Sequence, residues 1–302
     1  MFFEGAEKKC EISTASAVNL LDRPREFWQR MIDKCNAQIL SYQENGDCQA
    51  FLLSESSLFV WKNRVLLITC GVTTLVNSAL FFIEEVGKEN ITGLIFQRKN
   101  EIQSDLQISN FHEDVDKLKR HITGKFVQFG ELDKTYTLLF NMDNSSFPEE
   151  ADNTTELLMY QIPENICKKF QTNLTNKQAV RSFLKLEEVW PEFIIDDYSF
   201  TPFGYSLNAI SKFFYFTVHI TPQEKSPYIS LETNAPSDIQ KESVEHFLKI
   251  LNPGSFDLIT FNGPDLFSFE QDQCFQLGQD FKQNLESGHQ VHFKHYQSNK
   301  EA

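Results

Sequence analysis

Residues 51–60 have the sequence Phe51-Leu52-Leu53-Ser54-Glu55-Ser56-Ser57-Leu58-Phe59-Val60. A polar segment from Ser54 to Ser57 interrupts an otherwise apolar run, which predicts one strand, or two strands with a break at the polar segment. Three hydroxyls and a carboxylate are costly to bury unless each finds a hydrogen-bond partner. The simplest interpretation is a tight turn with Ser and Glu side chains at its exposed tip, because serine-rich turns are common.

On either side of this run, predicted strands outnumber predicted helices. Val65 to Ile68 are apolar throughout and predict a strand buried on both faces, and Gly71 leads into a helix that ends near Val86 at Gly87. Further strands are expected at 91–96, 126–129, 136–142, 213–220, 228–234, 256–261 and 289–295. Helices are expected at 24–39, 111–122 and 237–251, and within 154–170 and 271–302, with a polar loop at 42–48. This order predicts an α+β protein with antiparallel sheets rather than a doubly wound fold.

The composition predicts a globular protein without a nucleic-acid or membrane partner. The 302 residues are 41% hydrophobic, which is enough for a large core, and the formal net charge of -14 argues against binding to nucleic acid or to anionic lipid. The sequence has no secretory signal pattern and no apolar run long enough to span a bilayer. Its six cysteines have no C-x-x-C or metal-type spacing, so we expect a reduced, cytoplasmic protein without a metal site.

Two residues outside the 51–60 run have side chains suited to chemistry. Cys70 lies between a predicted strand and the start of a predicted helix, where the helix dipole favours the thiolate, although many cysteines are simply small buried residues. His219 shares the less apolar face of the predicted strand 213–220 with Tyr215 and Thr217. A single histidine at a strand end is often structural, so both interpretations stay open at this point.

Leu53-Ser54-Glu55-Ser56-Ser57-Leu58-Phe59 resembles the self-cleavage site of the eukaryotic-type S-adenosylmethionine decarboxylases. The resemblance runs from Phe3-Glu4-Gly5 through His219-Ile220-Thr221-Pro222 to Pro253-Gly254. It implies one domain, residues 1–302, folded as a four-layer α/β/β/α sandwich of two central antiparallel sheets with helices on both outer faces. It also implies cleavage between Glu55 and Ser56 into a β chain, 1–55, and an α chain, 56–302.

The resemblance assigns the catalytic roles as follows. Ser56 becomes a pyruvoyl cofactor that forms a Schiff base with the amino group of S-adenosylmethionine and withdraws electrons during loss of carbon dioxide. Ser206 and His219 act in self-cleavage, with His219 as the proton acceptor, and Cys70 donates a proton during decarboxylation. The product of the family is the aminopropyl donor for spermidine and spermine.

The resemblance also implies how the substrate binds. Phe3 and Phe200 match two rings that sandwich the adenine, and Glu55 lies at the edge of the ligand. The family has a glutamate that binds the ribose hydroxyls directly after His-Ile-Thr-Pro, whereas this chain has Gln223. Glutamine can hydrogen-bond a diol but lacks the negative charge.

A set of five acidic residues resembles the site where some animal enzymes bind the activator putrescine. They are Glu7, Glu11, Asp152, Glu156 and Glu232. The family has a lysine two residues before the catalytic cysteine, but Ile68 stands here, so either the diamine matters more in this chain or the charge network has changed. The resemblance further implies a homodimer of αβ units.

Two other functions compete with the decarboxylase. The first is a related non-catalytic regulatory subunit, which the departures at Ile68 and Gln223 favour and which the retained Glu55-Ser56, Cys70, Ser206 and His219 oppose. The second ignores the resemblance and makes Cys70 and His219 the pair of a thiol hydrolase. An uncleaved chain would support either competitor.

Overall fold

In both halves of the chain, more of the described residues lie in strands than in helices, as the sequence pattern predicts. The computed structural model describes residues 3–147, 153–174, 176–263, 274–286 and 288–299. The chain divides into two compact units. We call residues 4–150 with 284–289 the N-terminal unit, and residues 1–3, 151–283 and 290–302 the C-terminal unit. Over the described ranges, each unit is built on one eight-stranded sheet.

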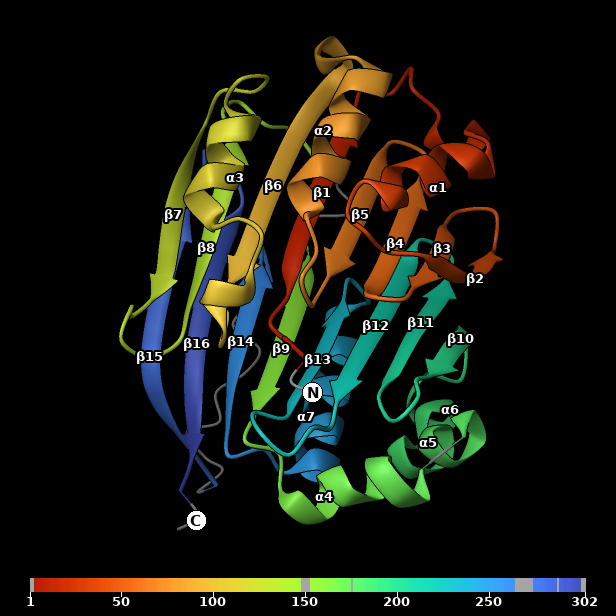
Figure 1. Cartoon of the computed structure of the whole chain (residues 1–302), viewed down its shortest axis with the longest axis vertical. Coiled ribbons are helices and arrows are strands. Elements are labelled where there is room, and N and C mark those ends of the chain that lie inside the picture. Colours follow the sequence, from red (N-terminus) through yellow and green to blue (C-terminus); the bar gives the residue numbers. More distant parts are fainter. Residues whose placement is uncertain (1–2, 148–152, 175, 264–273, 287, 300–302) are drawn as a thin grey trace. The chain divides into compact units, whose positions relative to one another are not determined.

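The sheet of the N-terminal unit has the strand order β2-β3-β4-β5-β1-β6-β8-β7, with antiparallel neighbours throughout. Its strands are β1 (Lys8–Thr14), β2 (Ile39–Glu44), β3 (Gln49–Leu53), β4 (Ser56–Trp61), β5 (Arg64–Thr69), β6 (Ile91–Lys99), β7 (Gly124–Gly130) and β8 (Tyr136–Met142). Its helices α1 (Arg25–Asp33), α2 (Leu75–Val86) and α3 (Phe111–Leu118) lie on one face of this sheet (Figure 1). Short 3-10 turns occur at η1 (Leu20–Asp22), η2 (Lys88–Asn90) and η3 (Ser104–Leu106).

The core of the N-terminal unit lies between the sheet and these helices. Trp28 of α1 stacks on Phe82 of α2 with ring centroids 6.3 Å apart, and both side chains are fully buried. Burying a large apolar side chain stabilises the fold by about 1.5–3 kcal/mol. The predicted end of α2 is confirmed, because Gly87 has a φ of +90° and its N–H donates to the carbonyl of Ile83. β5 is buried on both faces, as predicted.

The sheet of the C-terminal unit has the order β10-β11-β12-β13-β9-β14-β16-β15, and neighbours from β10 through β16 are antiparallel. Its strands are β9 (Thr154–Tyr160), β10 (Ile194–Ser199), β11 (Tyr205–Ser211), β12 (Phe214–Thr221), β13 (Tyr228–Thr233), β14 (Ser255–Phe261), β15 (Phe275–Asn284) and β16 (Gln290–Ser298). Its helices are α4 (Glu164–Lys168), a π-helical turn η5 (Lys169–Asn173), α5 (Lys177–Leu184), α6 (Leu186–Val189) and α7 (Ser237–Leu251).

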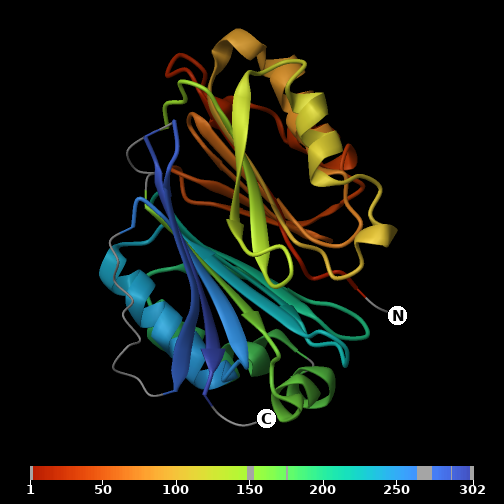
Figure 2. The same ribbon diagram turned by 90° about the vertical axis from the view of Figure 1, so that its left-hand side faces the viewer.

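Helix α7 runs along one face of the second sheet (Figure 2). Trp190 fills the space between them: its ring stacks on Phe216 of β12 at 4.1 Å and on Phe247 of α7 at 5.7 Å. The buried indole N–H of Trp190 donates to Ser243 of α7 at 2.9 Å. The α+β prediction with antiparallel sheets is therefore confirmed, and each sheet has its helices on one face.

Several predicted elements were wrong in type or extent. Helix α1 ends at Asp33, so the predicted helix 24–39 is too long, and β2 occupies part of the predicted polar loop 42–48. The helix expected within 154–170 is present only as α4 after Pro163, whereas residues 154–160 form β9, because pairing with β13 and β14 on both sides outweighs local helix preference. Residues 275–284, where a helix was expected within 271–302, form β15.

Candidate active site

The Glu55–Ser56 bond lies at the turn between β3 and β4. Leu53 and Ser56 are register partners, so Ser54 and Glu55 make up a two-residue turn. Ser54 fastens this turn to Gln38, because the Ser54 N–H donates to the Gln38 carbonyl at 2.8 Å and the Ser54 hydroxyl accepts from the Gln38 N–H at 3.0 Å. The predicted turn is confirmed. The expectation that the tip of this turn is exposed was wrong, because Glu55 is half-buried and Ser56 is buried.

Ser56 has a backbone conformation that side-chain-bearing residues rarely adopt. Its φ is +144°, although it is not a glycine. Residues held in such sparsely populated regions cost of order 1–3 kcal/mol each, and they persist where the surrounding structure holds them in place. Strain is therefore stored directly beside the Glu55–Ser56 peptide bond.

Cys70 supplies two hydrogen bonds to the carbonyl oxygen of Glu55. The backbone N–H of Cys70 donates at 2.9 Å, and the thiol donates at 3.2 Å. Strand pairing creates this contact. Ser56 opposes Thr69 in the β4–β5 register, so Cys70, which follows Thr69, lies opposite Glu55, which precedes Ser56. Two donors on one carbonyl oxygen are the arrangement that stabilises an oxyanion when a nucleophile attacks the carbonyl carbon.

This arrangement was not predicted from the sequence, where the family resemblance gave Cys70 the role of proton donor in decarboxylation. The signal was present in the spacing of the two strands, since a hairpin closed at Lys62 and Asn63 fixes which residues face each other. The expectation of a thiolate was wrong. Burial, together with the negative charges of Glu55 and Glu7, raises the pKa of the Cys70 thiol well above its ordinary value of 9. Cys70 is a protonated thiol.

Lys8 is a buried cation near this site that the sequence reasoning missed. Its ammonium donates to the carbonyl of Gly71 at 2.9 Å and to the side chain of Gln107 at 2.7 Å. Burial, and to a lesser extent Arg98, lowers its pKa to about 8. Burial raises the pKa of the Glu55 carboxyl to about 7 against the opposing effect of Lys8. Burial disfavours the charged form of both side chains, so Glu55 and Lys8 both titrate near neutral pH.

Ser206 and His219 lie side by side on β11 and β12 of the C-terminal unit. They are register partners, and Nδ1 of His219 lies 2.9 Å from the hydroxyl of Ser206. Nε2 of His219 lies 2.9 Å from the hydroxyl of Thr217, two residues earlier on the same face of β12. Burial lowers the pKa of His219 to about 3, so the imidazole is neutral at physiological pH. Thr217, which the sequence placed on the same face, fixes the orientation of the ring.

The predicted adenine-binding residues also belong to the C-terminal unit. Phe200 lies in the loop between β10 and β11, its N–H donates to the carbonyl of Gly204 at 2.9 Å, and its ring packs edge-on against Tyr198. Phe3 is 37% exposed. The side-chain amide of Gln223 pairs with the backbone of Phe3 through two hydrogen bonds, at 2.9 Å to its N–H and 2.8 Å to its carbonyl.

Four residues of the predicted acidic set are described, and Asp152 lies outside the described residues. In the N-terminal unit, Glu11 is buried and pairs with the guanidinium of Arg64 at 2.7 Å. In the C-terminal unit, Glu156 and Glu232 are both buried and are register partners on β9 and β13. Arg64 was not predicted as part of this site, although it begins the strand that contains Ile68.

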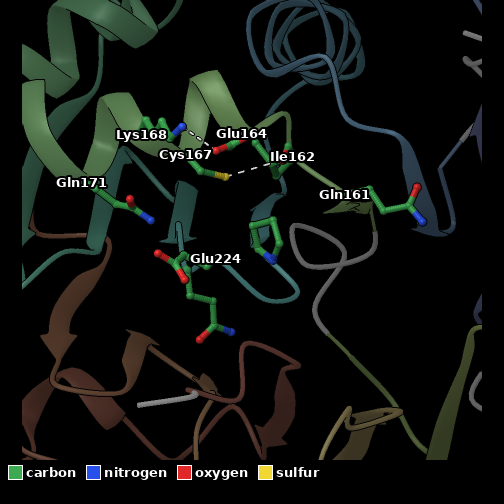
Figure 3. Close-up of a pocket in the computed structure, with 9 residues that line it drawn as sticks. Gln161, Ile162, Glu164, Cys167, Lys168, Gln171 and Glu224 are labelled. Carbon is green, nitrogen blue, oxygen red and sulfur yellow. Dashed lines mark hydrogen bonds and ion pairs between the residues drawn. The ribbon is translucent and has the colours of Figure 1, made fainter. Parts of the chain in front are cut away.

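A cavity of about 460 Å³ adjoins Gln223 in the C-terminal unit. Figure 3 shows side chains of α4 and η5 on one side of it and Glu224 on the other, with Gln161 pointing away. Lys168 pairs with Glu164 there, and the Cys167 thiol donates to the carbonyl of Ile162 (Figure 3). Of the predicted site residues that the structure describes, Gln223 alone lines this cavity.

The described residues contain neither a cluster of metal-binding side chains nor a membrane-spanning helix. No group of three or more His, Cys, Asp or Glu side chains is placed to hold a metal ion in this part of the chain. No helix among the described residues is long and apolar enough to cross a membrane.

Comparison with known proteins gives the chain a family context. The adenosylmethionine decarboxylase family model matches residues 1–301. S-adenosylmethionine decarboxylase proenzymes of three organisms are similar to it. The Trypanosoma cruzi protein is 32% identical over 283 residues, 87% of this chain and 76% of that protein. The Drosophila melanogaster protein is 31% identical over 297 residues, 89% and 85% of the two chains. The Dictyostelium discoideum protein is 30% identical over 281 residues, 84% and 73%.

A solved structure is also similar. It is the crystal structure of a Trypanosoma brucei AdoMetDC-delta26 monomer, with a TM-score of 0.63 and 25% identity. The match covers 80% of this chain and 99% of that one.

Proposed function

The chain belongs to the adenosylmethionine decarboxylase family as a decarboxylase proenzyme, and we propose that it makes its own pyruvoyl cofactor by cleaving the Glu55–Ser56 bond. It removes carbon dioxide from S-adenosylmethionine, and the product is the aminopropyl donor for spermidine and spermine. The observation that best supports the proposed cleavage is the pair of hydrogen bonds from Cys70 to the Glu55 carbonyl oxygen.

Cleavage begins when the hydroxyl of Ser56 attacks the carbonyl carbon of Glu55. The negative charge that develops on the carbonyl oxygen is stabilised by the N–H and thiol of Cys70. Collapse breaks the peptide bond and leaves Glu55 attached to Ser56 as an ester, with a free amino group on residue 56. The conversion of an amide to an ester is unfavourable, and release of the backbone strain at Ser56 offsets part of its cost.

The ester then eliminates. We assign His219 as the base that removes the α-proton of Ser56, and Ser206 as the residue that hydrogen-bonds the ester, following the family resemblance. The electron pair of the C–H bond forms a double bond as the Glu55 carboxylate leaves. Water then converts the resulting dehydroalanine to a ketone and releases ammonia. The neutral state of His219 suits this role, because a protonated imidazole cannot accept a proton.

The residues around Ser56 fit the group that this sequence of steps would leave there. When present, a pyruvoyl group supplies an electron sink for decarboxylation. Cys70 contributes a protonated thiol next to residue 56, which suits the return of a proton to the substrate carbon. A thiol held in this state is a poor nucleophile, so the observation opposes a thiol hydrolase. Phe3 and Phe200 would hold the adenine by stacking.

We extend the proposal to activation by diamines. Glu11 would bind an ammonium group of putrescine if its charge were uncompensated, yet Arg64 already pairs with it. The side chains of Arg64 and Glu11 are only 4% and 8% exposed, and Nε of Arg64 lies 2.7 Å from Oε1 of Glu11. A diamine would have to displace this charge-assisted hydrogen bond in order to bind Glu11. We propose that Arg64 replaces one ammonium group, and that putrescine stimulates this enzyme weakly or not at all.

The proposal extends to the cellular location and the assembly of the enzyme. Five of the six cysteines are buried, and all six are unpaired, which suits the reducing conditions of the cytoplasm. We propose a cytoplasmic enzyme of one decarboxylase domain, with chains 1–55 and 56–302, that associates as a homodimer of αβ units.

Intact-mass analysis tests the proposed cleavage. We expect two pieces, residues 1–55 and residues 56–302, with the second lacking an amino group at its first residue. The matched control is Ser56→Ala, which removes the attacking hydroxyl and should stay a single inactive chain. An active wild-type protein with an unmodified chain through residues 55 and 56 would contradict the proposal.

A further inference from the structure

The side-chain amide of Gln223 holds the backbone of Phe3 through two hydrogen bonds. Oε1 accepts from the Phe3 N–H at 2.9 Å, and Nε2 donates to the Phe3 carbonyl at 2.8 Å. Nε2 also donates to the carbonyl oxygen of Ser226, which lies 3.4 Å from Nε2. Gln223 is only 5% exposed, whereas Phe3 is 37% exposed. A buried side chain thus anchors an exposed residue that lies 220 positions away in the sequence.

Glutamine suits this contact and glutamate does not. A peptide unit offers one donor and one acceptor, and a side-chain amide offers the complementary pair. A carboxylate has acceptors alone, so it would bind the N–H of Phe3 but place its charge against the Phe3 carbonyl. Both N–H groups of Gln223 already have acceptors, which leaves one lone pair of Oε1 for a ligand. Gln223 therefore has little capacity left to bind a pair of hydroxyls.

From these contacts we infer that Gln223 is a positioning residue, which aids substrate binding by fixing Phe3 and not by binding the ribose hydroxyls. This inference rests on the proposed function, in which the ring of Phe3 stacks on adenine. The inference predicts that substrate binding depends on stacking of Phe3 on the adenine, and that the contribution of Gln223 to binding does not depend on the ribose hydroxyls. The backbone anchor reduces the entropy that Phe3 would otherwise lose when it orders against the substrate.

The first test is kinetic and uses the processed enzyme. Gln223→Leu removes both hydrogen bonds to Phe3, and we expect KM to rise about tenfold with kcat unchanged, because the ring of Phe3 is then no longer held in place before the substrate binds. The same rise is expected with an S-adenosylmethionine analogue that lacks the 2′ and 3′ hydroxyls. In a Phe3→Ala background, Gln223→Leu should have no further effect, because residues that act through one another are not additive.

The matched control is Gln171→Leu. Gln171 lines the same cavity and donates to the carbonyl of Pro222, the residue before Gln223, and among the described residues it has no hydrogen bond to Phe3. We expect its KM to equal that of the wild type. The inference is overturned if the effect of Gln223→Leu disappears with the deoxy analogue, or if it adds fully to the effect of Phe3→Ala.

A second test does not depend on activity. Ligand-free protein is treated with an aminopeptidase, and removal of residue 3 is followed by intact mass. Loss of the anchor should accelerate this removal several-fold in Gln223→Leu and leave it unchanged in Gln171→Leu. Equal rates in all three proteins would overturn the inference, even if the proposed decarboxylase activity were absent. Should Gln223→Leu fail to fold, Gln223→Asn, which is too short to reach both atoms, replaces it in both tests.

Discussion

Cys70 donates two hydrogen bonds, from its N–H at 2.9 Å and its thiol at 3.2 Å, to the carbonyl oxygen of Glu55. The two residues are fifteen positions apart and meet because β4 and β5 pair in one register. In the mechanism that we propose, this one residue serves two reactions in succession: its N–H and thiol stabilise the oxyanion of self-cleavage, and its thiol proton is then available for decarboxylation.

Cys70→Ala separates the two donors, because it removes the thiol and keeps the N–H. Loss of a strong oxyanion donor costs about 10²–10³ in rate, and a thiol is a weak donor, so we expect self-cleavage to slow about tenfold. Decarboxylation should be lost. Cys70→Ser, which retains a donor, should cleave at a rate near that of wild type. Time courses of freshly synthesised chain on denaturing gels measure these rates, and equal cleavage by Cys70→Ala and wild type would contradict a role for the thiol.

His219 should stay neutral far below the pH at which an exposed histidine titrates. Burial lowers its pKa to about 3, so the proton-accepting form predominates at every pH above that value. We expect its NMR resonance in uncleaved Ser56→Ala protein to keep one position from pH 8 to pH 5. The resonance is assigned by its absence from Ser56→Ala/His219→Ala. A titration with a midpoint near 6.5 would show that the imidazole is hydrated.

Glu55 should make the uncleaved chain less stable as the pH rises. Its pKa in the folded state is about 7 against an ordinary value of 4.5, so between these values the folded chain binds more protons than the unfolded chain. The free energy of unfolding of Ser56→Ala should therefore fall by about 1–2 kcal/mol from pH 4.5 to pH 7.5, after allowance for partial solvent screening.

Glu55→Gln in the same Ser56→Ala background is the control for this effect. It keeps the shape of the side chain and removes the titrating group, so the fall attributable to residue 55 should vanish. Urea titrations at pH 4.5, 6 and 7.5 measure the difference between the two proteins. A difference that is independent of pH would contradict the raised pKa of Glu55.

Phe200→Ala should weaken substrate binding without affecting self-cleavage. An aromatic stacking partner contributes about 0.5–1.5 kcal/mol beyond its buried area, so we expect KM to rise about tenfold or more. The N–H of residue 200 donates a hydrogen bond to the carbonyl of Gly204, which holds the loop, and the substitution keeps this backbone hydrogen bond. Tyr198→Ala, which removes the neighbouring ring, is the comparison. Unchanged saturation kinetics in Phe200→Ala would remove Phe200 from the binding site.

Local sequence pattern predicted the elements that carry the site better than it predicted the contacts within it. The turn at Ser54 and Glu55, the strand that ends before Cys70, and the face shared by Thr217 and His219 all follow from alternation and turn chemistry. These features depend on a few neighbouring residues. The same reasoning failed at β9, where apolar residues suited a helix but a central position in the sheet decided the outcome.

The contacts were not predicted, because they depend on strand register and on burial in the folded chain. The hydrogen bonds of Cys70 follow from the pairing of Ser56 with Thr69, and the protonated state of the thiol follows from its surroundings rather than from a helix dipole. The anchor between Gln223 and Phe3 joins residues at opposite ends of the sequence. No local pattern contains that information.

Arg64→Met tests whether an internal cation has taken the place of a diamine. The substitution leaves Glu11 buried without its guanidinium partner, and breaking a buried ion pair in this way costs about 3–5 kcal/mol. We expect a lower Tm and slower self-cleavage, and partial recovery of both on addition of putrescine, whereas wild type should respond little. Arg30→Met removes the same type of side chain from the exposed pair with Glu85, so it should change neither Tm nor the putrescine response. If wild type were strongly stimulated by putrescine and Arg64→Met were not, Arg64 would be part of the diamine's binding site and not its substitute.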